Sequence, residues 1–213
     1  DGAALPLYLS MNVKNLKQKG LIDSTITIGN AFGGDYECIN IYTGLITAKE
    51  IAKADVVFVS MGPGIAGTGT KYGFTGIEQG QILDAVKKLG GNPIAIPRIS
   101  FADKRDRHQG ISHHSITVFD KIVNVDVNIP ITIYESQKLN KIKEQLKENK
   151  LDEKHNIIFV ENNKCKEDLE YFGLKVKSMG RNYDEDSEFF DSASSAAYYL
   201  MEVCHDWERK YCK

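Results

Sequence analysis

Short runs of β-branched and apolar residues alternate with segments of helical apolar spacing along most of this 213-residue chain. Residues 25–29, 56–59, 93–97, 156–161 and 173–177 are predicted to form strands. Helical spacing predicts helices over residues 37–54, 77–89, 115–122, 138–150, 165–172 and 189–211. Because strands that alternate with helices form βαβ units, we predict an α/β fold with a doubly wound, Rossmann-like and mostly parallel sheet covered by helices on both faces.

The length fits one large domain, so we predict a single α/β domain over residues 1–213. The chain opens with Asp1-Gly2 and a helix-like run, which is typical of the end of a strand turning into a helix. A preceding strand would then be missing, and we expect a C-terminal fragment of a longer protein. Residues 123–133 contain Pro130 and are predicted to form an edge strand at best.

Charge and composition exclude several kinds of partner. The formal net charge is −2, which gives no basic field for nucleic acid, and no apolar run is long enough for a membrane span. The four cysteines are scattered without a C-x-x-C pair, which fits reduced thiols in the cytoplasm. The small residues of 192–197 favour close helix packing, either at the sheet or between the subunits of a homo-oligomer.

Ligands of parallel sheets bind beyond the carboxyl ends of the strands. Four polar segments follow predicted strands, counting the one expected before residue 1: Asp1–Gly2, Asn30–Asp35, Gly62–Gly80 and Arg98–His114. We expect them to meet at one sheet edge, with Asp35 among the ligand-binding residues. The predicted ligand is a small anionic molecule.

The glycine- and threonine-rich loop after residue 59 is the first candidate for binding an anion. Its backbone N–H groups and hydroxyls would cradle the ligand, through Gly62, Gly64, Gly67, Thr68, Gly69 and Thr70. The loop contains G-x-G-x-x-G, but more glycines follow before the helix, and the next predicted strand ends in Arg98 instead of an acid. We therefore expect no NAD(P) site. A tight loop that needs positive φ remains the structural alternative.

The second candidate is a cluster of basic and histidine residues between positions 98 and 114. Arginine binds phosphate and carboxylate groups in a bidentate manner, and histidine moves protons near neutral pH. We predict anion contacts by Arg98, Arg105 and Arg107, and catalytic roles for Asp103, His108, His113, His114 and Glu78. Glu78 also fits the first turn of a helix, where the helix dipole favours a carboxylate. A divalent metal held by histidine and carboxylate stays an alternative, although the spacing matches no standard zinc motif.

Several of these segments together resemble a bacterial family known as domain of unknown function 3866. The matching segments are Asp1–Pro6, Gly29–Asp35, Met61–Thr70, Tyr72–Gly80, Pro97–Asp103 and Ser112–His114. The resemblance is close over residues 1–120, and family members are longer at the N-terminus. It implies a bacterial, cytoplasmic protein and carries no established activity.

Two functional hypotheses follow. In the first, the chain is an enzyme that acts on a small phosphorylated or carboxylated metabolite through the Gly/Thr loop and the Asp/Arg/His cluster. In the second, it is a non-catalytic ligand-binding or regulatory module, or an oligomeric subunit. The gathering of histidine and carboxylate residues favours the first, since binding alone needs fewer proton-carrying groups.

Overall fold

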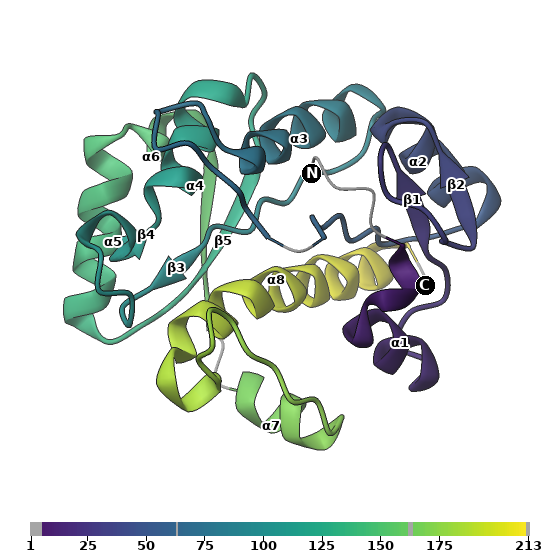
Figure 1. Cartoon of the computed structure of the whole chain (residues 1–213). Helices are drawn as coiled ribbons and strands as arrows, with labels where there is room; N and C mark the ends of the chain where they lie inside the picture. Colours follow the sequence, from purple (N-terminus) through teal and green to yellow (C-terminus); the bar gives the residue numbers. More distant parts are fainter. Residues whose placement is uncertain (1–5, 63, 162–163, 212–213) are drawn as a thin grey trace. The chain divides into compact units, whose positions relative to one another are not determined.

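Three two-stranded sheets, two of them parallel, and a larger number of helices make up the described part of this α/β chain (Figure 1). The structure is a computed structural model that describes residues 6–62, 64–161 and 164–211, with side chains only up to residue 204. The chain forms two compact units, residues 1–91 (unit 1) and residues 92–213 (unit 2). The polar segment Asp1–Gly2 lies outside the described residues. The single domain and the doubly wound sheet stay predictions.

Unit 1 is built on a short parallel pair, β1 (Ile26–Ile28) and β2 (Tyr36–Cys38). The predicted strand at residues 25–29 is thereby confirmed. Around this pair come η1 (Leu7–Leu9), α1 (Met11–Gln18), α2 (Ile41–Ile46), the π-helical η2 (Thr47–Ile51), η3 (Thr75–Ile77) and α3 (Glu78–Lys88). The helix predicted over residues 77–89 corresponds to α3, with Glu78 in its first turn.

Unit 2 contains the parallel pair β5 (Asn128–Thr132) and β6 (Asn156–Val160), and the antiparallel pair β3 (Ile99–Ser100) and β4 (Gly110–Ile111). Its helical segments are η4 (Asp106–His108), α4 (His113–Thr117), the π-helical η5 (Val118–Ile122), α5 (Ser136–Glu148), α6 (Leu151–Lys154), α7 (Cys165–Tyr171), η6 (Tyr183–Glu185) and α8 (Ser187–Tyr211). Long helix α8 packs against β3, β5 and β6.

Strand β5 agrees with the prediction of an edge strand at best, because it belongs to a two-stranded sheet with β6. β6 flanks it on one side, and Ile94 forms a parallel bridge to Asn128 at its start. Ile129 and Ile131 are buried. Pro130 is tolerated at such an edge because its missing N–H need not pair with a further strand, and its carbonyl accepts from Ser195 Oγ on α8 at 3.0 Å.

The same helix contact explains why residues 93–97 pair with β5 only at Ile94, although a strand was predicted there. Pro97 and Pro130 have no N–H group, so a longer ladder would lack donors. The Pro97 carbonyl instead accepts the Ser192 hydroxyl at 2.6 Å. The small residues of α8 therefore serve close packing against the strands, one of the two roles expected for them.

Two further predicted strands are absent from the described residues. Residues 56–59 form no strand, and their side chains are exposed, Phe58 by 75%. A wholly apolar strand is typical of a sheet that is covered on both faces, and in the described part of unit 1 strands β1 and β2 pair only with each other. Residues 173–177 also form no strand, and a turn over Ser178–Arg181 follows them.

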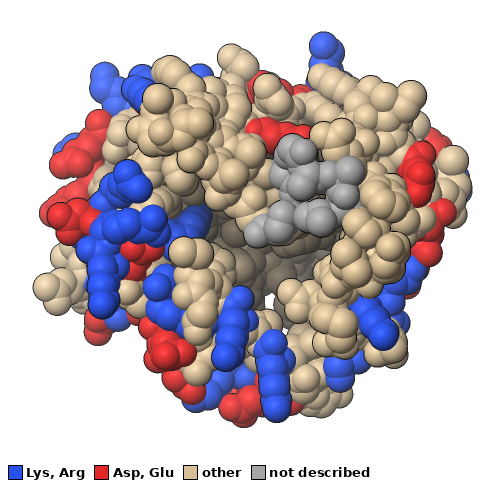
Figure 2. Space-filling model, in the orientation of Figure 1, with Lys and Arg blue, Asp and Glu red and all other residues tan. Residues whose placement is uncertain are grey.

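Charges of both signs are mixed on the molecular surface. On the face shown in Figure 2, Lys and Arg side chains lie beside Asp and Glu side chains along much of the rim. Among the helices of the described chain, none combines the length and the apolar character that crossing a membrane requires.

Candidate functional site

The predicted site residues fall into both units. Asp35, the Gly62–Thr70 loop and Glu78 belong to unit 1, whereas Arg98 and the residues up to His114 belong to unit 2. The structure brings together the second set, and the first set is engaged within its own unit.

Asp35 is an anchor inside unit 1. Its carboxylate accepts from Lys17 Nζ at 2.6 Å and from the Thr25 N–H and hydroxyl, each at 2.8 Å. The hydrogen bond from Lys17, supported by those from Thr25, lowers the pKa of Asp35 to about 2. The carboxylate thus ties α1 to the start of β1, and its ligand-binding role stays a prediction.

The Gly/Thr loop closes on itself. Thr68 N–H and Thr68 hydroxyl both donate to the Gly73 carbonyl, at 2.7 and 3.2 Å, and the Thr68 and Thr70 hydroxyls lie 3.0 Å apart. A Cβ on Gly73 would collide with the Thr68 and Thr70 hydroxyls, so another residue there would displace these side chains. Gly64 and Gly69 have φ of +119° and +80°. These are the features of a tight turn-rich loop; Pro63, inside the G-x-G-x-x-G stretch, lies outside the described residues.

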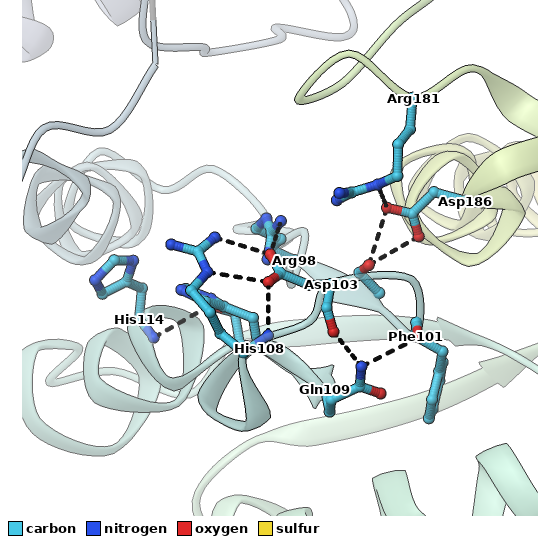
Figure 3. A network of polar contacts seen from close by, with 11 residues as sticks. Arg98, Phe101, Asp103, His108, Gln109, His114, Arg181 and Asp186 are labelled. Carbon is cyan, nitrogen blue, oxygen red and sulfur yellow. Dashed lines mark hydrogen bonds and ion pairs between the residues drawn. The ribbon is translucent and has the colours of Figure 1, made fainter.

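In unit 2, Asp103 holds two arginines in place (Figure 3). Arg105 Nε and Nη2 donate to its two oxygens at 3.0 and 2.8 Å, and Arg98 Nη2 donates to it at 3.3 Å. The Asp103 side chain is 6% exposed. The Arg105 hydrogen bonds hold the pKa of the Asp103 carboxyl well below its usual range despite burial. Such a carboxylate is a weak general base and a firm positioning residue.

The loop that carries Asp103 is fixed by two glutamines that the sequence did not single out. Gln109 Nε2 donates to the Phe101 carbonyl at 3.2 Å and to the Asp103 carbonyl. Gln145 on α5 accepts from Ile111 N at 2.8 Å and donates to the Gln109 carbonyl at 3.1 Å. Nothing in the sequence pattern indicated that these glutamines hold the loop, since glutamine on an amphipathic helix is typical of a solvated face.

Three histidines lie side by side next to the arginines. The ring centroids of His108, His113 and His114 are 4.0–5.6 Å apart. The His108 ring is oriented by Ser112, whose hydroxyl lies 2.8 Å from Nδ1. Ser112 is buried and begins α4, where its hydroxyl also accepts from His114 N.

All three imidazoles are held in the neutral state at pH 7. Burial lowers the pKa of His108 to about 4, and the charges of Arg105 and Arg98 add to this. Burial, the neighbouring His113 and Arg107 lower the pKa of His114 to about 4. The pKa of His113 is lowered by burial and by Arg107 and Arg105. The cluster is therefore a neutral set of rings in a positive field.

Two buried nitrogen atoms of this cluster have no hydrogen-bond partner among the described residues, namely Arg98 Nη1 and His113 Nε2. Arg98 itself is well fixed, by Asp103 and by the Phe189 ring 5.9 Å from its guanidinium carbon. A buried donor without an acceptor costs free energy, and native proteins rarely leave one unused. The cluster thus contains two buried polar atoms whose hydrogen-bonding capacity is unused among the described residues.

A metal finds no ready set of ligands here. Among the residues that the structure describes, no three His, Cys, Asp or Glu side chains are grouped so that they could hold a metal ion. In this arrangement Asp103 is bound to arginines and the three histidine rings pack on one another. The divalent-metal alternative thus has no support in the geometry.

A second buried network borders the cluster. Asp186, which is 2% exposed, accepts from Ser100 Oγ at 2.8 Å and from Arg181 Nε at 3.0 Å (Figure 3). The sequence hid this network because Asp186 lies in an acidic stretch before α8, where capping explains carboxylates. Its role is to fix the start of α8 beside β3.

Comparison with known proteins gives a family and no function. A family model described as "Protein of unknown function (DUF3866)" matches residues 1–197. Neither a curated protein nor a solved structure matches the chain. The matched range covers the resemblance seen in the sequence and extends well beyond residue 120. The chain therefore belongs to the DUF3866 family of proteins of unknown function.

Proposed function

We propose that unit 2 binds the anionic group of a small phosphorylated or carboxylated metabolite at the Arg98–His114 cluster, and that a histidine of the cluster moves a proton during its conversion. The observation that carries this proposal is the pair of buried, unpartnered nitrogens, Arg98 Nη1 and His113 Nε2, in one cluster. An anion would supply acceptors to both.

The fixed charges favour an anion over a neutral ligand. Arg98 and Arg105 share a single carboxylate, that of Asp103, so this group of three side chains keeps an excess positive charge, with Arg105 half exposed. Arg98 is held on two sides, by Asp103 and Phe189, so little conformational entropy is lost when a ligand binds. A rigid guanidinium with a free edge is well suited to an oxyanion.

The histidines provide the proton chemistry. A neutral imidazole accepts a proton, and an anion beside it favours the protonated form. His108 is the best oriented of the three, because Ser112 fixes its Nδ1 and thereby the direction of Nε2. We assign it the role of proton carrier, with His113 as an anion contact. The catalytic role of Glu78 and the anion-binding role of the Gly/Thr loop, both in unit 1, stay predictions.

The second candidate is a non-catalytic ligand-binding module. It is favoured by one observation: Asp103, the carboxylate expected to be catalytic in this cluster, is committed to two arginines and is not available as a base. In this version the histidines only contact the ligand. A cytoplasmic location and a homo-oligomer accompany both versions as predictions.

A thermal-shift screen tests binding, since a ligand that binds only the folded state raises the midpoint of unfolding. Inorganic phosphate, phosphate monoesters and small carboxylates are the probes, with divalent cations tested separately. We expect stabilisation by anions that is reduced in Arg98→Gln and His113→Gln and unchanged in Lys141→Gln, an exposed lysine on α5. Equal stabilisation of the wild type and both cluster variants would rule out this site.

Turnover separates the two versions. Phosphorus NMR of the monoesters that stabilise the protein would show product formation by an enzyme, and its loss in His108→Asn. Stabilisation without turnover of any bound monoester would support the binding module.

A further inference from the structure

We infer that the anion group of this site is a tetrahedral dianion, such as a phosphoryl group, and that its binding draws one proton onto the histidine cluster. This inference rests on the proposed function and goes one step further, by naming the shape and charge of the ligand and the proton that accompanies it.

The shape follows from the directions of the donors. The ring planes of His108, His113 and His114 are inclined to one another by 42–71°. Their N–H bonds therefore do not lie in one plane, and the guanidinium of Arg98 adds a further direction. A carboxylate presents its acceptors in one plane, whereas a phosphoryl or sulfuryl group presents three oxygens in three directions. Donors spread in this way match the tetrahedral group.

The charge follows from the groups around the rings. Arg98 precedes β3, Asp103 and Arg105 lie in the next loop, and Arg107 lies in η4. From α8, the group that contacts Arg98 is the uncharged Phe189 ring, and from α5 the contact near β4 is the uncharged amide of Gln145.

Two further acids lie near the cluster. Asp106, in η4, is exposed to solvent. Asp186, which borders the cluster before α8, is paired with Arg181. The arginines are thus the groups that repel a proton from the imidazoles, and a dianion at Arg98 would cancel that repulsion and attract a proton itself.

One proton, rather than three, is expected because the rings are close. With centroids 4.0–5.6 Å apart, two imidazolium charges would repel each other strongly in a buried setting. Once one ring is protonated, the other two stay neutral and act as N–H donors or acceptors. The ring that gains the proton becomes a charge-assisted donor to the anion.

Sulfate is the probe that isolates the proton uptake, because it stays a dianion across the neutral pH range and cannot supply the proton itself. Isothermal titration of the full chain with sulfate at pH 7, in two buffers of different ionisation enthalpy, measures the number of protons taken up. We expect about one, and a binding constant that rises as the pH falls from 8 to 6.5. His108→Asn and His114→Gln should lower the uptake, while Lys141→Gln should leave it unchanged.

The outcomes separate this inference from the proposed function. Sulfate binding with an enthalpy that is the same in both buffers would overturn the proton uptake and leave the anion site intact. Acetate binding as tightly as sulfate would overturn the tetrahedral shape. Absence of binding by sulfate, phosphate and acetate would remove the proposed function itself. Nitrogen-15 NMR of the histidine rings, recorded with and without sulfate, identifies the protonated ring and should show a single one.

Discussion

At the scale of single residues, the candidate site combines a carboxylate that is paired with arginines and two nitrogen atoms that have no hydrogen-bond partner among the described residues. Asp103 is consumed by Arg105 and Arg98, whereas Arg98 Nη1 and His113 Nε2 remain without a partner in the described part of the chain. The residue types alone predicted a cluster of Arg, Asp and His. The residue types do not indicate which carboxylate pairs with an arginine, because the pairing depends on the loop conformation that Gln109 and Gln145 stabilise.

The lowered histidine pKa values predict how stability depends on pH. The unfolded chain binds protons on histidine as the pH falls through 6.5, but His108 and His114 in the folded chain do so only near 4. Folding stability from these groups is therefore present above pH 6.5 and is lost as the pH falls to 4. For buried His108 alone the loss is on the order of 3 kcal/mol.

Urea unfolding at several pH values between 7 and 4.5, where most carboxylates remain ionised, measures this dependence. His108→Asn, whose amide can still bond to Ser112, should flatten the pH dependence, and the exposed substitution Lys141→Gln should not. A wild-type stability that is constant from pH 7 to 4.5 would show that the imidazoles are not held neutral.

Asp103→Asn should be strongly destabilising. The substitution removes the charge that pairs with two arginines while leaving Arg98 mostly buried, and breaking a buried ion pair in this way costs about 3 kcal/mol. The exposed Asp106→Asn, three residues away, should change stability by less than about 0.5 kcal/mol. Chemical denaturation of both variants at pH 7 checks the difference, and equal stabilities would show that Asp103 does not anchor the arginines.

At the scale of elements, hydrophobic spacing predicted most helices correctly. It was less successful for strands, because strand formation depends on pairing with other segments. The predictions for α3, α5, α7 and α8 agree with the structure to within a few residues, as do those for β1 and β6. Residues 56–59 carry the apolar run of a buried strand, yet pairing with distant segments decides whether such a run joins a sheet. The doubly wound arrangement stays a prediction for the same reason.

Strand β5 was predicted correctly as an edge strand at best, since it contains Pro130 and pairs with β6 in a two-stranded sheet. The hydroxyls of Ser192 and Ser195 on α8 satisfy the carbonyls of Pro97 and Pro130, a compensation that lies more than 60 residues away along the chain. Single-sequence periodicity contains no information about contacts at that separation.

This compensation can be measured. Ser195→Ala removes a buried hydroxyl whose single proton is shared between the Ser192 carbonyl, at 2.7 Å, and the Pro130 carbonyl, at 3.0 Å, and should destabilise the protein by roughly 1–2 kcal/mol. Ala197→Ser, an exposed change on the same helix, should be within about 0.5 kcal/mol of the wild type. Thermal unfolding of the two variants is the comparison, and a neutral Ser195→Ala would mean that the close approach of α8 does not depend on this hydrogen bond.

At the scale of the whole molecule, membership of the DUF3866 family supplies no reaction, so the function must be argued from the site. The net charge of −2 and the mixture of charges seen in Figure 2 contrast with the local excess of arginine around residues 98–107. A positive cluster on a nearly neutral molecule favours a small anionic ligand over a large polyanion, which would need an extended basic surface.

The most direct test of the anion site is a crystal structure determined with selenate, a tetrahedral dianion whose selenium gives an anomalous signal. We predict an anomalous peak from a selenate ion whose oxygens lie about 3 Å from Arg98 Nη1 and His113 Nε2, and loss of that peak in Arg98→Gln. An anomalous peak elsewhere on the molecule, with none at this pair of atoms, would contradict it.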